Sequence, residues 1–511
     1  MTIPDHTLAG WFARRVNHTP DRAMLTFEGT TWTYRQFDDR AAALAGVLRA
    51  GGVGAGDRVA YLAFNHPTFL ETMFACARLG AIFVPLNFRL TGPELSFIID
   101  DAGIHTIVVG PDHRPTIDAV RSELPVQRWI GVEGAPNGWE DYEEVLGAAE
   151  PADRVLDLDI ESVAVIMYTS GTTGRPKGAM LSHRNLWWNN LGTLHTQEYL
   201  DNEVTLVVAP LFHIGGLNVT TLIVLQKGGE VVLHRHFDPA AALHAIPDHG
   251  ITSMFGVPAM FLFMSQQGDF DEVDLTSIKV AICGGAPVPE PLMKRYAGVG
   301  VPFFQGYGLT ETAPSLTVLT KEYTDAKLGS AGRPVFFVDM KLIDDEGNTV
   351  TEPFAMGEIC ARGPNIMAGY WNRPDATAEA IDADGWFRTG DAGYVDEDGF
   401  WFVADRVKDM VISGGENVYP AEVEEVLLAH PAIAEVAVIG TPSERWGEAV
   451  CAVVDVNGEP PSLEELRDFA GEQLARYKLP TRLEVVDEIP HNASGKMLKR
   501  ELRNRFSTES A

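Results

Sequence analysis

Positive charge is scarce in this sequence. The chain has 511 residues, with 40 Lys+Arg against 71 Asp+Glu and a formal net charge of −31 at pH 7. Nucleic acid and anionic lipid surfaces repel such a chain, so we expect neither as its main partner. If the substrates are anions, a few local cations must bind them against this background.

Cysteine is equally scarce, and no secretory signal is evident. The four cysteines are Cys76, Cys283, Cys360 and Cys451. Each lies in an apolar stretch and none forms a C-x-x-C pair, which excludes a disulfide scaffold and suits reduced thiols in a cytoplasmic protein. The opening residues MTIPDHT lack the basic and apolar regions of a signal peptide.

No long, uniformly apolar run is present. Residues 204–226 carry no Asp, Glu, Lys or Arg, but Pro210, His213 and two glycines interrupt them. A membrane-spanning helix would be more uniform, so this stretch predicts a strand, a loop and a buried helix. We therefore do not expect an integral membrane protein.

Short apolar runs alternate with helical patterns through the first four fifths of the chain. These runs are residues 58–64, 106–110, 163–169, 204–210, 230–234 and 279–285. Near-continuous apolar strands followed by helices predict the buried mixed or parallel sheets of an α/β protein. After about residue 330, the turn signals DDEGNTV (344–350) and DEDGF (396–400) predict hairpins.

The C-terminal residues read as a compact unit of strands and helices. We predict an α/β protein with a large N-terminal body, residues 1–405, and a small α+β C-terminal domain, residues 409–511, joined by residues 406–408. In the body, mixed or parallel sheets are sandwiched with helices, and a β-rich segment follows them.

The segment most informative about chemistry is TSGTTGRPKG, residues 169–178, directly behind an apolar run. Its hydroxyl side chains are Thr169, Ser170, Thr172 and Thr173. Gly171 and Gly174 allow backbone N–H groups to turn toward an anion, and Lys177 adds positive charge. Gly178 follows Lys177 where a Walker A loop needs Ser or Thr, so the pattern predicts a different cradle for a polyphosphate.

This loop resembles the phosphate-binding signature of adenylate-forming enzymes, which include acyl- and aryl-CoA synthetases, standalone adenylation domains and luciferases. Further motifs follow in the family's order and extend the resemblance over nearly the whole chain. They are PLFHIGG (210–216), CGGAP (283–287), QGYGLTE (305–311), YWNRPDAT (370–377), GWFRTGD (385–391), DRVKDMVISGGENVYPAEVE (405–424) and PHNASGKMLKREL (490–502). The resemblance implies a mobile C-terminal lid and a reaction in two steps. A carboxylate attacks the α-phosphorus of ATP to give acyl-adenylate and pyrophosphate, and the thiol of CoA then displaces AMP.

The resemblance also assigns residues to the nucleotide. The phosphate loop is joined by Gly284, Gly285, Ala286, Gln305, Gly306, Tyr307, Gly308, Asp391 and Arg406. Tyr307 offers an aromatic face to adenine and Gln305 a polar edge, while Asp391 matches the carboxylate that accepts the ribose hydroxyls. Arg406 matches a contact to ribose or phosphate. Thr310 can donate to phosphate, and Glu311 is placed to hold Mg²⁺.

The remaining implied roles belong to the lid and the thiol. Lys408 matches the hinge residue, and Lys496 matches the lysine that bridges the substrate carboxylate and the α-phosphate. Ser413, Gly414, Gly415 and Trp446 match positions near pantetheine. Leu479 and Thr481 carry no charge in a segment that is more basic in some relatives, so the sequence assigns no contact to the CoA phosphates there. His213 is either a gate to the acyl or pantetheine channel or an ordinary core histidine.

The residues predicted to line the acid pocket are small and apolar. We expect it around residues 212–218, 256–261, 284–286 and 305–315, where no Arg or Lys is placed to bind a second carboxylate. A fatty acid and a hydroxycinnamate-type aryl acid both fit, and the chain also resembles feruloyl-CoA synthetases. Because no carrier domain follows Lys496, CoA is the expected acceptor. The alternative is a standalone adenylation enzyme that loads a carrier-protein thiol, and a homodimer is left open.

Overall fold

The computed structural model describes residues 5–155, 157–169, 175–197, 199, 202–285, 288, 290–324, 326–344, 346–406, 411–418, 420–490 and 499–507. The chain forms two compact units. The first comprises the residues up to Phe88, Ile99–Met167 and Gly178–Ala404. The second comprises Arg89–Ile98, Tyr168–Lys177 and the residues from Asp405 onward.

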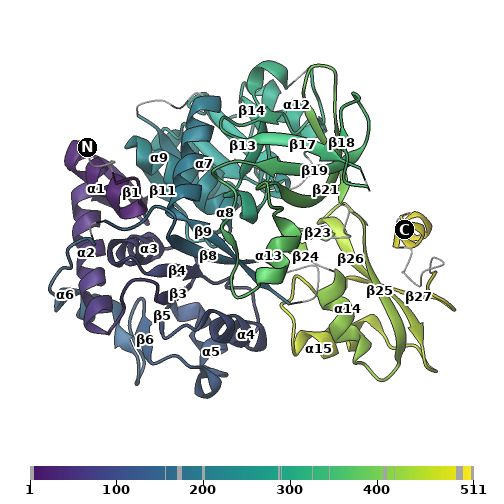
Figure 1. Ribbon diagram of the computed structural model, residues 1–511, viewed down its shortest axis with the longest axis horizontal. Coiled ribbons are helices and arrows are strands. Elements are labelled where there is room, and N and C mark those ends of the chain that lie inside the picture. Colours follow the sequence, from purple (N-terminus) through teal and green to yellow (C-terminus); the bar gives the residue numbers. More distant parts are fainter. Residues whose placement is uncertain are drawn as a thin grey trace. The chain divides into compact units, whose positions relative to one another are not determined.

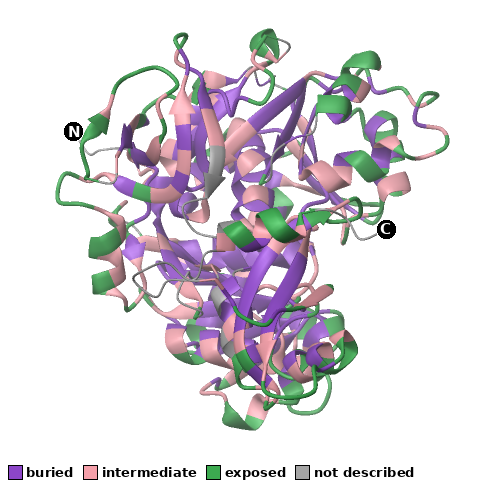
Figure 2. Ribbon diagram, turned by 90° about the vertical axis from the view of Figure 1, so that its right-hand side faces the viewer, coloured by how far each residue is buried: buried purple, intermediate pink, exposed green. Residues whose placement is uncertain are grey.

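A nine-stranded sheet in the first unit carries two of the sequence motifs. Its strands, in spatial order, are β16 (Arg333–Pro334), β15 (Ser315–Leu319), β14 (Phe303–Gly308), β13 (Val280–Gly284), β12 (Ser253–Gly256), β10 (Val204–Val207), β11 (Glu230–Leu233), β1 (Ala23–Phe27) and β2 (Thr30–Thr33). The run from β14 to β1 is parallel, and both edges are antiparallel. These inner strands are largely buried, as near-continuous apolar runs require. Buried segments of the chain are purple in Figure 2.

A second, eight-stranded sheet is built from residues 58–182, with one edge strand from residues 369–370. Its order is β20 (Gly369–Tyr370), β9 (Lys177–Ser182), β8 (Val163–Thr169), β4 (Ile82–Pro85), β3 (Arg58–Leu62), β5 (Thr106–Val109), β6 (Arg128–Gly131) and β7 (Glu140–Asp141). The strands from β8 to β7 pair in parallel, and β20 runs antiparallel to β9. All the apolar runs predicted as strands therefore form strands in these two sheets.

Helices of the first unit connect these strands (Figure 1). They are α1 (Leu8–His18), α2 (Tyr34–Ala50), α3 (Pro67–Leu79), α5 (Arg114–Asp118), α6 (Tyr142–Gly147), α7 (His183–Thr196), α8 (Ile214–Gly216), α9 (Leu222–Lys227), α10 (Pro239–His249), α11 (Pro258–Ser265), α12 (Glu290–Gly298) and α13 (Pro374–Ala380). Helix α4 (Gly92–Ala102) is shared by the two units. Local sequence sets the ends of α3, because Pro67 opens its first turn and Gly80 closes it with φ +70°.

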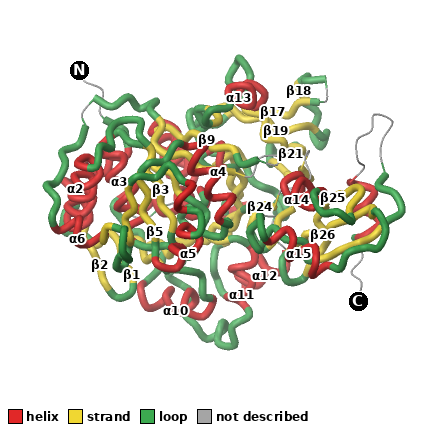
Figure 3. The backbone as a smooth tube through the Cα atoms, turned by 90° about the horizontal axis from the view of Figure 1, so that it is seen from below, coloured by secondary structure: helices red, strands yellow, loops and turns green. Residues whose placement is uncertain are grey.

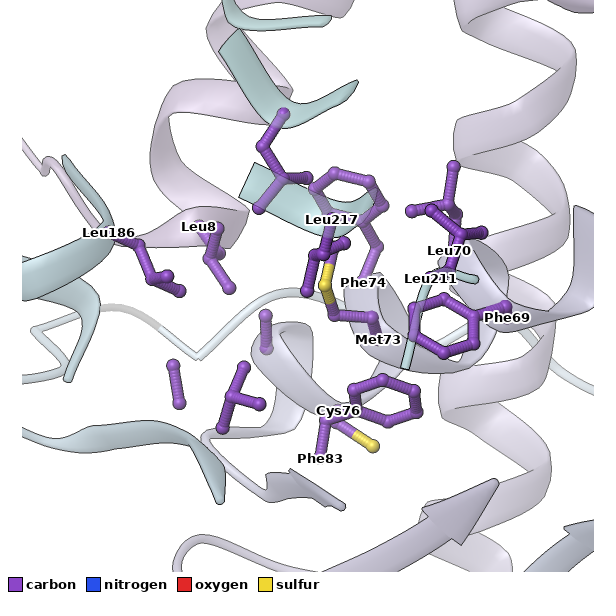
Figure 4. Close-up of a cluster of buried hydrophobic side chains, with 14 of the residues drawn as sticks. Leu8, Phe69, Leu70, Met73, Phe74, Cys76, Phe83, Leu186, Leu211 and Leu217 are labelled. Carbon is purple, nitrogen blue, oxygen red and sulfur yellow. The ribbon is translucent and has the colours of Figure 1, made fainter. Parts of the chain in front are cut away.

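The main core lies where these helices meet the sheets. Helices α2 and α3 pack side by side (Figure 3), and α3 presents Phe69, Met73 and Phe74 to the interior. In Figure 4 these side chains gather with Leu211 and Leu217. The core therefore anchors both sides of the PLFHIGG motif.

The predicted β-rich segment is a third, five-stranded sheet. Its order is β18 (Thr349–Val350), β17 (Asp339–Ile343), β19 (Gly357–Arg362), β21 (Phe387–Val395) and β22 (Trp401–Arg406). Both predicted turns lie between strands of this sheet, since 344–348 separates β17 from β18 and 396–400 separates β21 from β22. The hairpin interpretation of these turn signals is confirmed.

The second unit has its own sheet and core. The sheet order is β24 (Glu416–Val418), β23 (Val411–Ser413), β26 (Gly447–Val456) and β25 (Ile433–Ser443), and β27 (Arg482–Val485) pairs in parallel with β26. Its helices are α14 (Pro420–Leu428), α15 (Leu463–Gly471) and α16 (Lys499–Phe506). The predicted α/β class, with a large body and a smaller α+β C-terminal part, is confirmed. The boundaries at 405 and 409 remain predictions.

The charge-free stretch 204–226 folds as its interruptions predict. It forms β10, a loop, and one continuous helical segment made of α8, a π-helical turn at Leu217–Thr221 and α9. Over the described ranges, no helix is both long enough and apolar enough to cross a membrane.

Candidate active site

The CGGAP and QGYGLTE motifs lie next to each other at the ends of parallel strands. In the register of β13 and β14, Cys283 is opposite Gln305 and Gly284 is opposite Gly306. A Cβ atom on Gly284 would lie 3.0 Å from the carbonyl oxygen of Gly306, and one on Gly308 would collide with the carbonyl of Pro314. Glycine at these two positions therefore allows the neighbouring main-chain segments to approach each other closely.

Tyr307 and Asp391 are joined directly. The Tyr307 hydroxyl donates to Oδ2 of Asp391 over 2.8 Å. Asp391, in β21, is 3% exposed, and its main-chain N–H donates to the Thr389 hydroxyl over 3.1 Å. The structure thus brings together an aromatic ring and a fixed carboxylate, the two groups that sequence reasoning assigned to adenine and ribose.

Glu311 is held by a residue to which sequence reasoning gave no role. The Tyr370 hydroxyl donates to Oε1 of Glu311 over 2.9 Å, and the Met367 N–H donates to the Glu311 carbonyl over 2.8 Å. Glu311 is 8% exposed and lies, with Thr310, in the single turn Thr310–Thr312. Tyr370 opens the YWNRPDAT motif, so the family resemblance was the available signal for it.

Gln305 has unused hydrogen-bonding capacity. Its Oε1 atom is buried and has no hydrogen-bond partner among the residues that the structure describes. A buried amide oxygen without a partner costs stability unless a ligand supplies a donor. The exocyclic amino group of adenine is such a donor, which fits the predicted role of Gln305 at the base.

His213 lies at the start of a helix on the predicted acid side. It is the N-cap residue of α8, it is half-buried, and its ring packs on Phe212 with 4.3 Å between centroids. Two positions later, a Cβ on Gly215 would meet the Phe255 ring at 2.7 Å, and one on Gly284 would meet the same ring at 3.5 Å. Sequence reasoning missed Phe255, which lies just before the predicted 256–261 segment.

Asn65 fixes the main chain just before His213. Its Nδ2 atom donates to the carbonyls of Ala209, over 3.0 Å, and His234, over 3.2 Å. Its Oδ1 atom accepts from the Leu211 N–H over 2.8 Å. These bonds join the end of β3 to the strand ends of the nine-stranded sheet, a long-range arrangement that the sequence pattern does not disclose.

Part of the predicted nucleotide site lies outside the described residues. That part is Ser170, Gly171, Thr172, Thr173, Gly174 and Ala286. Lys408 and Lys496 also lie outside the described residues, and Arg406 is described only as the last residue of β22. At the borders of the phosphate loop, the Thr169 hydroxyl donates to the Lys177 carbonyl over 3.4 Å.

The predicted pantetheine residues meet at one turn of the second unit. Ser413 is paired with Gly447, and the Gly414 N–H donates to the Trp446 carbonyl over 2.8 Å. A Cβ on Gly414 would lie 3.0 Å from the Trp446 ring, and both Gly414 and Gly415 have positive φ, +58° and +82°. The backbone therefore needs glycine at this turn, and Trp446 covers it.

In the segment ARYKLP, residues 475–480, the charge of the lysine is neutralised within the protein. The Lys478 ammonium is buried and donates to Glu94 over 2.6 Å and to Glu422 over 2.8 Å. Burial lowers the pKa of Lys478, but the carboxylates of Glu422 and Glu94 outweigh it and raise the pKa overall. Lys478 is therefore a structural cation, and Leu479 beside it is buried.

The predicted metal residue is a single carboxylate, that of Glu311. Among the residues that the structure describes, no group of three or more His, Cys, Asp or Glu side chains could hold a metal ion. Mg²⁺ does not need such a cage, because it binds through one or two carboxylates together with waters and substrate phosphates. An oriented, nearly buried Glu311 suits that mode.

Comparison with known proteins places the chain in a family. The AMP-binding enzyme family model matches residues 12–371, and the AMP-binding enzyme C-terminal domain matches 422–496. The chain is similar to a feruloyl-CoA synthase of Amycolatopsis sp, 46% identical with 98% of this chain and 99% of that protein covered. It is also similar to an indoleacetate–CoA ligase of Aromatoleum aromaticum, 41% identical with 97% of each covered.

A solved structure agrees with these matches. A double mutant of the o-succinylbenzoate CoA synthetase of Bacillus subtilis, bound with its product analogue, superposes with a TM-score of 0.88 at 35% identity. The match covers 97% of this chain and 98% of that one. The chain belongs to the AMP-binding, adenylate-forming enzyme family, and the predicted resemblance is confirmed.

Proposed function

We propose that the chain is an AMP-forming acid–thiol ligase that activates a carboxylic acid as acyl-AMP and transfers the acyl group to CoA. Family membership supports the reaction class. The observation that carries the proposal is the pair of tyrosine–carboxylate bonds around QGYGLTE, Tyr307 to Asp391 and Tyr370 to Glu311. They hold two carboxylates in fixed positions, one suited to a cis-diol and one to a metal.

In the first half-reaction the protein positions and neutralises charge. ATP would lie with adenine on Tyr307, its amino group toward Gln305 and its ribose on Asp391. Glu311 would hold Mg²⁺, which when bound neutralises phosphate charge that would repel the attacking carboxylate. Thr310, the phosphate-loop hydroxyls and Lys177 would hold phosphate oxygens.

Several of these roles rest on resemblance. We propose that Arg406 contacts ribose or phosphate, that Lys408 is the hinge of residues 409–511, and that Lys496 bridges the acid carboxylate and the α-phosphate. A single long ammonium suits a charge that must arrive and leave with a moving domain.

The second half-reaction requires a thin channel for a thiol. We propose that pantetheine passes Ser413, Gly414 and Gly415 beside Trp446, with His213 as a gate. The glycine turn beside the Trp446 indole supports this placement. A standalone adenylation enzyme that loads a carrier-protein thiol is the alternative, since pantetheine is common to both acceptors.

We propose an aryl acid of the hydroxycinnamate type as the substrate, with a fatty acid as the second candidate. The Phe255 ring beside Gly215 and Gly284 forms a flat apolar wall, which suits a planar ring. The named relatives that act on feruloyl and indoleacetate groups support the same class. The four buried, unpaired thiols suit a reducing cytoplasm, and a homodimer remains a proposal.

Acid-dependent ATP–pyrophosphate exchange tests the first half-reaction. We expect exchange with ferulate-like acids, and absence of exchange with every aryl and fatty acid tried would overturn the proposal. Thioester formation with CoA, compared with a phosphopantetheinyl carrier protein, separates the two acceptors.

Lys496→Ala tests the division of labour between the two steps. Loss of exchange with retained thioester formation from supplied acyl-AMP is the expected result. An equal loss of both steps would contradict a lysine that serves adenylation alone.

A further inference from the structure

The loop that carries Thr310 and Glu311 is fastened by buried asparagines from distant parts of the chain. The Asn365 Nδ2 atom donates to the carbonyl of Thr312, over 2.8 Å, and to that of Ser315, over 2.9 Å. The Asn189 Oδ1 atom accepts from the Ser315 N–H over 3.0 Å. These side-chain bonds add to the main-chain bonds of the turn, in which the Ala313 N–H donates to the Thr310 carbonyl over 3.2 Å.

Asn218 connects this loop to the helix that follows His213. Its Nδ2 atom donates to the Ala313 carbonyl over 2.6 Å, while its own main-chain carbonyl accepts from Asn189 Nδ2 over 3.2 Å. Asn218 lies in the π-helical turn Leu217–Thr221, a rare geometry that is frequent at functional sites. One amide therefore links the acid side of the site to the metal side.

The three asparagines have almost no contact with solvent. Asn189 is 1% exposed, Asn218 0% and Asn365 2%. The contacts fix the orientation of each amide, because each Nδ2 faces a carbonyl oxygen. Within the described ranges, the Oδ1 atoms of Asn218 and Asn365 have no partner. Burial of an amide costs desolvation free energy that its hydrogen bonds must offset, and here those bonds hold the main chain of the loop.

We propose that Asn218 and Asn365 are positioning residues for adenylation. They fix the 309–315 loop so that the Glu311 carboxylate and the Thr310 hydroxyl are already in place when ATP binds. Asn218 additionally couples that loop to the helix that begins after His213. The inference rests on the proposed ligase function, and it adds residues that do not themselves touch substrate.

Replacement of the amide by a carboxylate tests this directly. Asn365→Asp keeps the shape of the side chain but turns an oxygen toward the carbonyls of Thr312 and Ser315. The expected result is a fall of about 10- to 100-fold in the maximal rate of ATP–pyrophosphate exchange, with a rise in the Mg²⁺ concentration at half-saturation. Thioester formation from supplied acyl-AMP, which needs neither ATP nor Mg²⁺, should stay within about threefold of wild type.

Asn218→Asp should show the same loss and also a raised KM for the acid, because its loop and its helix move together. The matched control is Asn190→Asp. Asn190 is equally buried, and its Nδ2 atom donates over 2.8 Å to the Gln226 side chain. Gln226 can rotate its own amide to donate to the new carboxylate, whereas a main-chain carbonyl cannot, so Asn190→Asp should retain wild-type exchange.

The possible results separate the inference from the proposed function. No exchange in the wild-type protein refutes the ligase proposal itself. If the wild type is active, two results for Asn365→Asp refute the positioning role. One is unchanged exchange, and the other is an equal reduction of exchange and thioester formation. If Asn365→Asp does not fold, Asn218→Ser, which removes a single bond, takes its place with the same comparison of the two half-reactions.

Discussion

The hydroxyl of Tyr370 should control how well Glu311 binds magnesium. Tyr370→Phe removes one oxygen and leaves the ring, so the change deletes the 2.9 Å bond to Oε1 of Glu311. A hydrogen bond to a charged group contributes about 1.5 to 3 kcal/mol. Since about 1.4 kcal/mol is a factor of ten, we expect the exchange rate at low Mg²⁺ to fall by about 10- to 100-fold.

The burial of Glu311 places the effect in the upper part of that range. The residue is 8% exposed, so water can replace the lost hydroxyl only poorly. The carboxylate would then lose its fixed orientation while keeping its charge. The half-saturating Mg²⁺ concentration should rise, and saturating Mg²⁺ should recover part of the rate.

The assay is ATP–pyrophosphate exchange with a saturating acid across a Mg²⁺ titration. Tyr323→Phe is the control, because Tyr323 is an exposed tyrosine of the same unit whose ring packs on Phe400. A Tyr370→Phe enzyme whose Mg²⁺ curve overlays that of the control would refute the positioning of Glu311 by Tyr370. A uniform loss of rate at every Mg²⁺ concentration would place Tyr370 at the nucleotide instead.

Three further changes test other parts of the structure. Gly215→Ala would place a methyl group 2.7 Å from the Phe255 ring, so kcat/KM for ferulate-sized acids should fall by roughly tenfold, and short acids should be affected less. Burial lowers the pKa of His183 from 6.5 to about 4. Between those pH values the His183 imidazole is therefore protonated in the unfolded chain but neutral in the folded chain. The free energy of unfolding should therefore fall by roughly 3 kcal/mol as pH drops through that window, and His183→Asn should remove this loss in urea titrations. Arg40→Met leaves the fully buried Glu71 without the guanidinium 2.6 Å away, which should cost about 3 to 5 kcal/mol in the same measurement; wild-type stability would contradict that account.

Local patterns in the sequence were sufficient to predict the strands and the tight turns. The apolar runs at 58–64 and 163–169 became β3 and β8, because a strand buried on both faces must be apolar at every position. The turn signal at 344–350 formed a hairpin because Asp and Gly satisfy the backbone geometry of a tight turn locally.

Local sequence patterns could not predict which residues hydrogen-bond to the site residues. Tyr370 and Glu311 are 59 positions apart, and Asn365 binds carbonyls 53 and 50 positions away. Such contacts depend on which strands lie next to each other, and the order of strands in a sheet cannot be read from a single sequence. Motif resemblance could indicate that Tyr370 matters, but only the fold shows that its hydroxyl faces Glu311.

An acidic chain can bind polyanionic substrates if its site carboxylates are oriented by neutral donors. Phenol hydroxyls hold Asp391 and Glu311, and asparagine amides hold the loop around Glu311. An arginine at Tyr370 would orient the same carboxylate but would also neutralise it and weaken its attraction for Mg²⁺. Elsewhere, Arg40 and Arg235 are each clamped between two carboxylates, so these cations serve the fold. Under the proposed function, neutral donors would leave the negative charge of Glu311 available to Mg²⁺, and Mg²⁺ would in turn let a protein of net charge −31 accept a triphosphate.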